Sequence, residues 1–339
     1  MAGFQDIVGH NKIINHLKNA IKMDKVSHAY IINGEDNSGK MMLAEAFAMA
    51  LQCENRSKKD GSEPCGTCRS CRQAMDRNQP DIIFIGQDEM MEDKKTKSIS
   101  VDEIRTLLNN DIVIKPYSSK YKIYIVDHAE KMNIQAQNAL LKTIEEPPAY
   151  GVILLLTSNA ESFLPTILSR CIILNIKTVE EELIKKHLMK NYHVPDYKAE
   201  ICASFAQGNV GKAIQLASSD SFNEMKKEVL SLVKKMEDIE VYELGHTIKI
   251  INVYKKNIDE FLDLLTLWYR DVLYIKATDD VNNLIFRDEV YDIKKQAAKR
   301  SYAGIEKILQ ALELTRTRLK ANVNFDLVIE MLLLTIKEN

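Results

Sequence analysis

The stretch Gly34-Glu35-Asp36-Asn37-Ser38-Gly39-Lys40-Met41 fits the phosphate-binding loop pattern G-x-x-x-x-G-K-[ST] at every position except the last. In that pattern the glycines let backbone N–H groups approach phosphate oxygens, the lysine reaches the outer phosphates, and the final hydroxyl binds Mg²⁺. A thioether cannot replace the hydroxyl, because Mg²⁺ is a hard cation that takes oxygen ligands. Gly34, Gly39 and Lys40 are therefore candidate nucleotide-binding residues, and Met41 removes the ordinary magnesium ligand.

The flanks of this loop have the character that the motif requires. Residues 28–33 form a short apolar run, which predicts a strand, and residues 42–51 are rich in helix formers. A strand, a glycine turn and a helix are thus expected to follow one another. The alternative is a glycine-rich turn that never meets phosphate, since short motifs also occur by chance.

A second altered motif lies at the end of the apolar run 121–127. The run ends in Asp127, and in phosphate-loop ATPases a strand likewise ends in an Asp that helps to hold the metal. The next residue is His128, where many such ATPases have a Glu that polarises the attacking water. A neutral imidazole does not replace that carboxylate, and Glu130 is poorly placed to do so. Asp127 by itself could equally cap the following segment. The changes at the metal and water positions agree, and they predict a chain that hydrolyses nucleotide poorly or not at all.

Four of the six cysteines lie in one short region, at Cys53, Cys65, Cys68 and Cys71. Thiolates at C-x-x-C spacing can share one tetrahedral ion, and four of them leave no open position for water, so we expect a structural zinc site. Disulfides are one alternative, but the start of the chain has no secretory segment and a reducing cytoplasm is expected. An iron–sulfur cluster is the other alternative.

Length and composition bound the class of protein. A chain of 339 residues is too long for one ordinary core and predicts two or three domains. The formal net charge is only −2, so any contact with nucleic acid needs a local basic patch. No apolar run approaches the roughly 20 residues of a membrane helix. Cys171 and Cys202 lie in apolar surroundings, which predicts that they are core residues.

Apolar runs and helical patterns alternate through the first half of the chain. Besides the runs already described, elements are expected at residues 13–21, 81–85, 100–104, 134–144 and 151–157. Ser100 and Glu103 have the spacing of a capping box at the start of a helix. The charged stretch 86–98 is expected to be an exposed loop. Apolar, β-branched strands that alternate with helices predict an α/β fold in which helices cover both faces of a parallel sheet.

The second half of the chain is expected to be all-α. Residues 179–188 have apolar side chains at helical spacing, and Gly and Pro are scarce after about residue 220. Residues 258–273 form a long apolar segment of this kind, and apolar stripes this broad usually face an internal core. The single tryptophan, Trp268, is therefore expected inside a helical bundle.

Several segments together resemble the AAA+ clamp-loader ATPases of bacterial replication. They are His28-Ala29-Tyr30, Asn138-Ala139-Leu140-Leu141-Lys142-Thr143-Ile144-Glu145-Glu146-Pro147-Pro148, Thr157-Ser158-Asn159 and Leu168-Ser169-Arg170-Cys171. The resemblance covers residues 4–215 in motif order and the whole chain in layout, and it is specific because the long run and the Ser-Arg-Cys triplet occur together at the family spacing. It implies an AAA+ P-loop domain over residues 1–175 with the cysteine module at about 53–71, a helical lid over 176–220, and a helical collar for oligomerisation over 221–339.

The resemblance also implies roles for single residues. Arg170 resembles the arginine finger that such subunits insert into a neighbour's ATP site, where a permanently charged guanidinium can fork around phosphate oxygens. The alternative is a surface arginine paired with an acid. Asn159 stands where the family senses the γ-phosphate region, unless it is only a hydrogen-bonding residue at a strand end. Gly211 stands where the gamma/tau motor subunits carry an Arg, and Lys212 is one position away and does not replace it.

By this resemblance the chain is a cytoplasmic clamp-loader subunit of the DNA polymerase III holoenzyme, a DNA-directed DNA polymerase. Its expected partners are gamma/tau and delta subunits in a hetero-pentamer, the sliding clamp that they load, and primed DNA indirectly, with no membrane. Met41, His128 and Gly211 predict little or no ATPase activity of its own. Zinc is the expected cofactor, and binding of ATP or ADP is left open. Two alternatives remain, an active gamma/tau-type motor ATPase and a non-replicative AAA+ zinc-binding adaptor.

Overall fold

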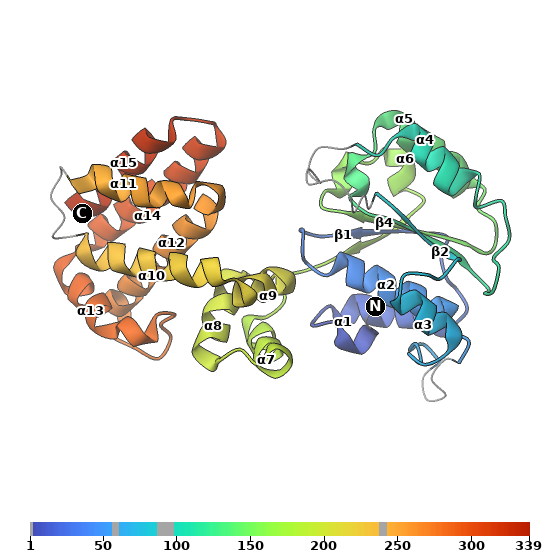
Figure 1. Ribbon diagram of the computed structural model, residues 1–339, viewed down its shortest axis with the longest axis horizontal. Helices are drawn as coiled ribbons and strands as arrows, with labels where there is room; N and C mark the ends of the chain where they lie inside the picture. Colours follow the sequence, from blue (N-terminus) through green and yellow to red (C-terminus); the bar gives the residue numbers. More distant parts are fainter. Residues whose placement is uncertain (1–2, 56–60, 87–97, 237–242) are drawn as a thin grey trace. The chain divides into compact units, whose positions relative to one another are not determined.

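The computed structural model describes residues 3–55, 61–86, 98–236 and 243–339. The chain divides into two compact units, Met1–His187 with Gly208–Lys212, and Leu188–Gln207 with Ala213–Asn339. The first unit contains the sheet and the second is helical (Figure 1). The predicted division into sheet domain, lid and collar stays a prediction.

A five-stranded parallel sheet with the order β2-β3-β4-β1-β5 forms the centre of the first unit. Its strands are β1 (Ala29–Asn33), β2 (Ile82–Ile85), β3 (Lys122–Val126), β4 (Gly151–Thr157) and β5 (Ile172–Asn175). Tyr30 in β1 pairs with Leu154 of β4 on one side and with Ile172 of β5 on the other. The predicted parallel sheet is confirmed, and the four predicted strands lie within one residue of their expected bounds.

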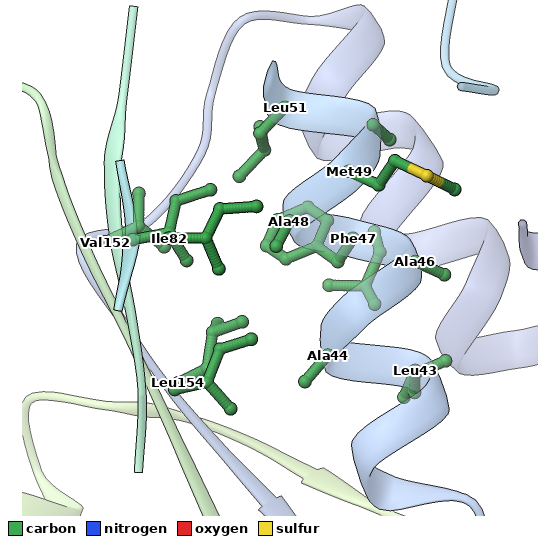
Figure 2. Packing of buried hydrophobic residues seen from close by; sticks show 14 of the residues in the cluster. Leu43, Ala44, Ala46, Phe47, Ala48, Met49, Leu51, Ile82, Val152 and Leu154 are labelled. Carbon is green, nitrogen blue, oxygen red and sulfur yellow. The ribbon is translucent and has the colours of Figure 1, made fainter. Parts of the chain in front are cut away.

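One face of the sheet packs against α1 (Asn11–Lys22), α2 (Lys40–Gln52) and α3 (Arg69–Met75). In Figure 2, Ala44, Ala48 and Leu51 of α2 lie on the side of the helix that faces β4, the strand that carries Val152 and Leu154. The helix is buried nearly all round, because it contacts α1 and α3 as well as β1 and β4. An apolar sequence on every side is what such a central position requires.

The opposite face of the sheet packs against α4 (Val101–Ile104), the π-helical turn Arg105–Asn109, α5 (Ile134–Glu145) and α6 (Pro165–Leu168). The predicted capping box at the start of α4 is confirmed. Ser100 Oγ accepts a hydrogen bond from Glu103 N at 3.2 Å, and Glu103 Oε2 accepts one from Ser100 N at 2.8 Å. Of the predicted charged loop, residues 87–97 lie outside the described part of the chain.

The remaining helices are α7 (Glu181–Tyr192), α8 (Asp196–Phe205), α9 (Val210–Ser218), α10 (Asp220–Lys235), α11 (Leu244–Val253), α12 (Ile258–Thr278), α13 (Val290–Lys299), α14 (Tyr302–Lys320) and α15 (Phe325–Glu338). Short helical turns occur at Phe4–Asp6, Ala129–Lys131, Ala160–Ser162, Lys255–Asn257 and Arg287–Glu289. Among the described helices, none has both the length and the apolar character needed to cross a membrane.

Trp268 lies at the centre of the second unit, as predicted, with 0% of its surface exposed. Its Nε1 donates to Gln296 Oε1 at 3.0 Å, and Gln296 Nε2 in turn donates to Val233 O at 2.7 Å. This chain of bonds joins α12, α13 and α10. Because the indole N–H and the amide are both paired, burial of these polar groups leaves none of these donors unsatisfied. Cys202 is also fully buried, and burial raises its pKa to about 11.

Candidate functional site

The predicted nucleotide-binding residues follow the carboxyl ends of neighbouring strands. Gly34 follows β1, Asp127 follows β3, and Asn159 comes shortly after β4. Because β3, β4 and β1 are adjacent and parallel, these residues lie along one edge of the sheet, where ligands bind in open α/β folds. Gly34 N donates to Thr157 O at 3.0 Å, which joins two of these strand ends directly.

The loop between β1 and α2 joins a strand to a helix through a glycine turn, which is the order of elements that the phosphate-loop motif requires. Gly39 has a φ of +91°, in the left-handed region that favours glycine, and α2 begins at the next residue, Lys40. Lys40 is only 7% exposed, and its Nζ donates to Gly34 O at 2.5 Å and to Asp36 Oδ1 at 3.4 Å. The lysine that would meet a phosphate is thus engaged by the carbonyl and carboxylate of its own loop.

A segment far away in the sequence packs against this loop within the same compact unit. Asn209 Nδ2 donates to Asp36 O at 2.8 Å, and Gly211 N donates to Asn37 O at 3.1 Å. A Cβ on Gly211 would lie 2.3 Å from Asn37 O, so any larger residue requires the loop to move. Position 211 is where the family resemblance would place an arginine. In this chain a side chain at that position would collide with the backbone of the loop.

The metal and water positions hold no replacement for the missing groups. Met41 packs against the hydrophobic cluster around α2. Asp127 Oδ1 accepts from the adjacent His128 N at 3.0 Å, and this bond does not cap the following turn, whose N-cap residue is His128. His128 Nδ1 lies 3.2 Å from Glu130 Oε1, and Glu130 also accepts hydrogen bonds from the backbone N and the Oγ of Ser158.

Glu130 is thus fixed between two strand ends rather than left open to a water molecule. Burial opposes its ionisation, but its own backbone N–H and the imidazole of His128 together hold the pKa of Glu130 below the usual value. Asn159 is engaged in a similar way, since its Oδ1 accepts from Glu161 N at 3.0 Å and caps a short helical turn. These contacts favour the structural alternative for Asn159.

The four clustered cysteines have the geometry of a metal centre. The sulfur atoms of Cys53, Cys65, Cys68 and Cys71 all lie within 4.8 Å of one another, and Cys65 Sγ is 4.0 Å from Cys71 Sγ. Zn–S bonds of about 2.3 Å in a tetrahedron place the sulfurs roughly 3.8 Å apart, so the arrangement fits a zinc ion. All six cysteines of the chain are free, which does not support the disulfide alternative.

Backbone N–H groups point at these sulfurs. Cys65 N donates to Cys53 Sγ, Cys68 N to Cys65 Sγ and Cys71 N to Cys68 Sγ, at 3.3, 3.3 and 3.4 Å. Burial raises the pKa of Cys53 and Cys71. Burial also acts on Cys65, but N–H donors from Thr67 and Cys68 outweigh it and lower the pKa of Cys65 to about 6. Because metals bind thiolates, these donors favour the ligand form of the cluster.

Arg170 lies at the opposite edge of the sheet from the phosphate loop. It precedes β5, whose first residue Ile172 is level with Tyr30, whereas Gly34 is four residues beyond Tyr30. At about 3.3 Å per residue, the four residues from Tyr30 to Gly34 span roughly 13 Å along the strand. The turn that holds Arg170 adds to this separation, which is already longer than an arginine side chain. The guanidinium of Arg170 therefore cannot serve its own chain's loop.

Two groups near these sites were not singled out from the sequence. Asn209 contacts a loop 173 residues away, and Glu145 Oε1 lies 3.1 Å from Arg170 Nη2. The pairing of Arg170 with an acid was the alternative expected for a surface arginine, and the structure contains that pair. Glu145 belongs to the quoted segment Asn138 to Pro148, and Asn209 precedes Gly211 by two residues, but nothing in the sequence there indicates which distant segment they contact.

Comparisons with known proteins identify the family of this chain. A family model described as "DNA polymerase III, delta subunit" matches residues 9–180, and one described as "DNA polymerase III, delta subunit, C terminal" matches residues 202–338. The DNA polymerase III subunit delta' of Bacillus subtilis is 29% identical over 334 residues, which cover 96% of each chain. Subunit tau of the same organism is 28% identical over 318 residues, which cover 88% of this chain and 54% of tau. A DNA polymerase III gamma subunit-related protein from Thermotoga maritima, 20% identical, superimposes with a TM-score of 0.47 over 96% of this chain and 98% of its own.

The parallel sheet, the four-cysteine cluster and the helical C-terminal region are the features expected from the resemblance to the clamp-loader class. The chain belongs to the DNA polymerase III delta-subunit family and is a clamp-loader subunit of that polymerase. Within this family, Met41 and His128 resemble the delta-prime type rather than the gamma/tau type, and the similarity to a delta-prime subunit over nearly the whole of both chains agrees with that resemblance. The identity to tau is nearly as high as the identity to delta', so identity alone does not separate the two types of subunit.

Proposed function

We propose that this clamp-loader subunit hydrolyses little or no ATP and supplies Arg170 to the ATP site of a neighbouring subunit. The observation that carries the proposal is the position of Arg170, which is partly exposed and lies at the sheet edge remote from its own phosphate loop. A guanidinium there can act only on a phosphate that another chain brings to it. Such a group offsets charge that develops during phosphoryl transfer.

The state of the chain's own loop supports the first half of the proposal. Met41 offers no hard oxygen to magnesium, and Lys40 is engaged by Gly34 and Asp36. The backbone of Gly211 lies directly against the loop, at Asn37, and leaves no room for a side chain there. Binding of ATP or ADP at Lys40 would therefore have to displace existing hydrogen bonds without gaining a normal magnesium site.

The family of the chain supports a proposal about its partners. We infer a cytoplasmic assembly with gamma/tau and delta subunits, closed as a hetero-pentamer through helices of residues 221–339. The assembly would load the sliding clamp on primed DNA, and this chain would contact DNA only indirectly. The cysteine cluster would hold a structural zinc ion through Cys53, Cys65, Cys68 and Cys71, with no role in hydrolysis because four thiolates leave no open position.

Reconstitution with gamma/tau and delta partners tests this function. Arg170→Ala should assemble normally but lower DNA-stimulated ATP turnover, whereas Arg105→Ala, which removes another exposed arginine, should not. Unchanged turnover with Arg170→Ala would remove Arg170 from the mechanism.

The competing function is a gamma/tau-type motor, which the similarity to tau favours. Steady-state ATPase of the purified chain decides between them. A motor would hydrolyse ATP alone and lose that activity in Lys40→Ala, while the proposed subunit would show no activity that depends on Lys40.

A further inference from the structure

The guanidinium of Arg170 is folded onto its own chain at both terminal nitrogens. Nη1 donates to Thr166 O at 3.0 Å and to Ser169 Oγ at 3.3 Å, while Nη2 lies 3.1 Å from Glu145 Oε1. Glu145 is the last residue of α5, and Arg170 follows α6, which packs against α5. The fork of N–H groups that would bind a phosphate is therefore already in use.

The carboxylate of Glu145 and a phosphate compete for this fork. Both are anions that a guanidinium binds through paired N–H groups. A phosphate oxygen at Nη2 would lie close to the Glu145 carboxylate, and like charges at such distances repel each other. The side chains of Arg170 and Glu145 are 41% and 47% exposed, and ion pairs this exposed are weak. The pair can therefore open at little cost when a stronger anion arrives.

We propose that Glu145 is a positioning residue that holds Arg170 in a retracted rest position and releases it when a neighbouring subunit presents phosphate. The inference rests on the proposed function of Arg170 as a finger acting in trans. Because Arg170 must give up its ion pair with Glu145 to extend, it extends only when a phosphate anion replaces that pair. A neighbouring subunit that docks without nucleotide offers no such replacement. Glu145 thus restrains Arg170 rather than orienting it for catalysis.

Glu145→Gln tests the inference, because it keeps the shape of the side chain and removes its charge. Glu146→Gln is the matched control, since it removes the same charge from the adjacent exposed residue. In the reconstituted complex, Glu145→Gln should raise DNA-stimulated ATP turnover about 1.5- to 5-fold, the range that exposed ion pairs typically allow. Glu146→Gln should leave turnover unchanged, and Glu145→Gln combined with Arg170→Ala should match Arg170→Ala alone. Unchanged or lower turnover with Glu145→Gln would overturn the inference.

A second measurement does not depend on ATP hydrolysis. In the isolated chain labelled with ¹⁵N-arginine, the Arg170 side-chain signal is assigned by its loss in Arg170→Lys. That signal should shift and exchange faster with water in Glu145→Gln and not in Glu146→Gln. A signal that does not respond means that the pair is absent in solution, and the inference fails even if Arg170→Ala abolishes turnover. A signal that responds while Arg170→Ala leaves turnover intact means that the proposed function has failed, and the restraining role of Glu145 in catalysis fails with it.

Discussion

The phosphate loop and Arg170 both carry a positive charge suited to phosphate, but the chain treats the two charges differently. Lys40 is 7% exposed and bonded within its own loop, which Asn209 and Gly211 also contact from outside. Arg170 is 41% exposed, and its partners are the exposed carboxylate of Glu145, the hydroxyl of Ser169 and the carbonyl of Thr166. Lys40 is held inside its own loop, whereas Arg170 is exposed at a position that another chain can reach.

The cost of access explains this separation. Lys40 is buried, and freeing it would break its bond to Gly34 O, whereas its other partner, the Asp36 carboxylate, is 65% exposed. A buried polar group left without a partner typically costs about 1–3 kcal/mol. Freeing Arg170 breaks an exposed pair that contributes about 1 kcal/mol or less. The same sheet therefore presents a buried, bonded cation, Lys40, at its carboxyl edge and an exposed cation, Arg170, at its amino edge.

The largest effect should come from the metal cluster, which begins directly after the helix that starts at Lys40. Cys71→Ser should abolish stoichiometric zinc and destabilise the first unit by several kcal/mol, a part of the ~10 kcal/mol that structural zinc can contribute. Metal analysis after dialysis and thermal unfolding measure this. Cys171→Ser, at a thiol outside the cluster, should keep the metal. Full zinc content in Cys71→Ser would remove that thiol from the site.

Arg170→Lys tests whether the exposed cation needs the planar guanidinium or only a positive charge. A lysine keeps the charge but lacks the planar fork, so turnover at the site that Arg170 completes should fall by about 10²-fold or more. Single-turnover hydrolysis in the reconstituted complex measures the effect, with Arg105→Lys as the control. Full activity in Arg170→Lys would mean that charge alone, without the fork, is what the neighbour needs.

Gly211→Ala tests whether the close contact at Gly211 constrains the loop that holds Lys40. The added Cβ would lie 2.3 Å from Asn37 O, so the loop must shift and the first unit should lose about 1–3 kcal/mol of stability. Gly245→Ala is a control of opposite sign, because it adds a methyl group in open space within α11 and should stabilise by about 0.5–1 kcal/mol. Hydrogen exchange should show faster exchange in residues 34–40 for Gly211→Ala only. Equal effects of the two substitutions would mean that the close contact at Gly211 does not constrain the loop.

Lys40→Ala should have the smallest effect on function. Because this lysine is proposed to serve no ATP of its own, turnover of the reconstituted loader should change by less than about twofold, while Arg170→Ala lowers it strongly. Assays of both variants in one preparation make the comparison direct. A loss of turnover in Lys40→Ala equal to that in Arg170→Ala would break the contrast and favour the motor function.

Much of the fold could be predicted because its signals are local. The four predicted strands are continuous apolar runs, and their bounds agree with the structure within one residue. β5 was not predicted, since it is short, lies at the edge of the sheet and is only partly buried. The cysteine cluster was predicted because C-x-x-C spacing brings two thiols to one ion without any help from the rest of the chain.

The sequence alone determined that a phosphate loop lacks its magnesium ligand, that four thiols can share one ion, and that a sheet unit precedes a helical one. Each of these depends on residues close together in the chain, whose chemistry and spacing are sufficient. Only the tertiary structure decided that Arg170 lies at the edge opposite Gly34, that Glu145 pairs with it, and that Gly211 has no room for a side chain. These contacts join segments distant in sequence, and the packing of strands and helices brings them together.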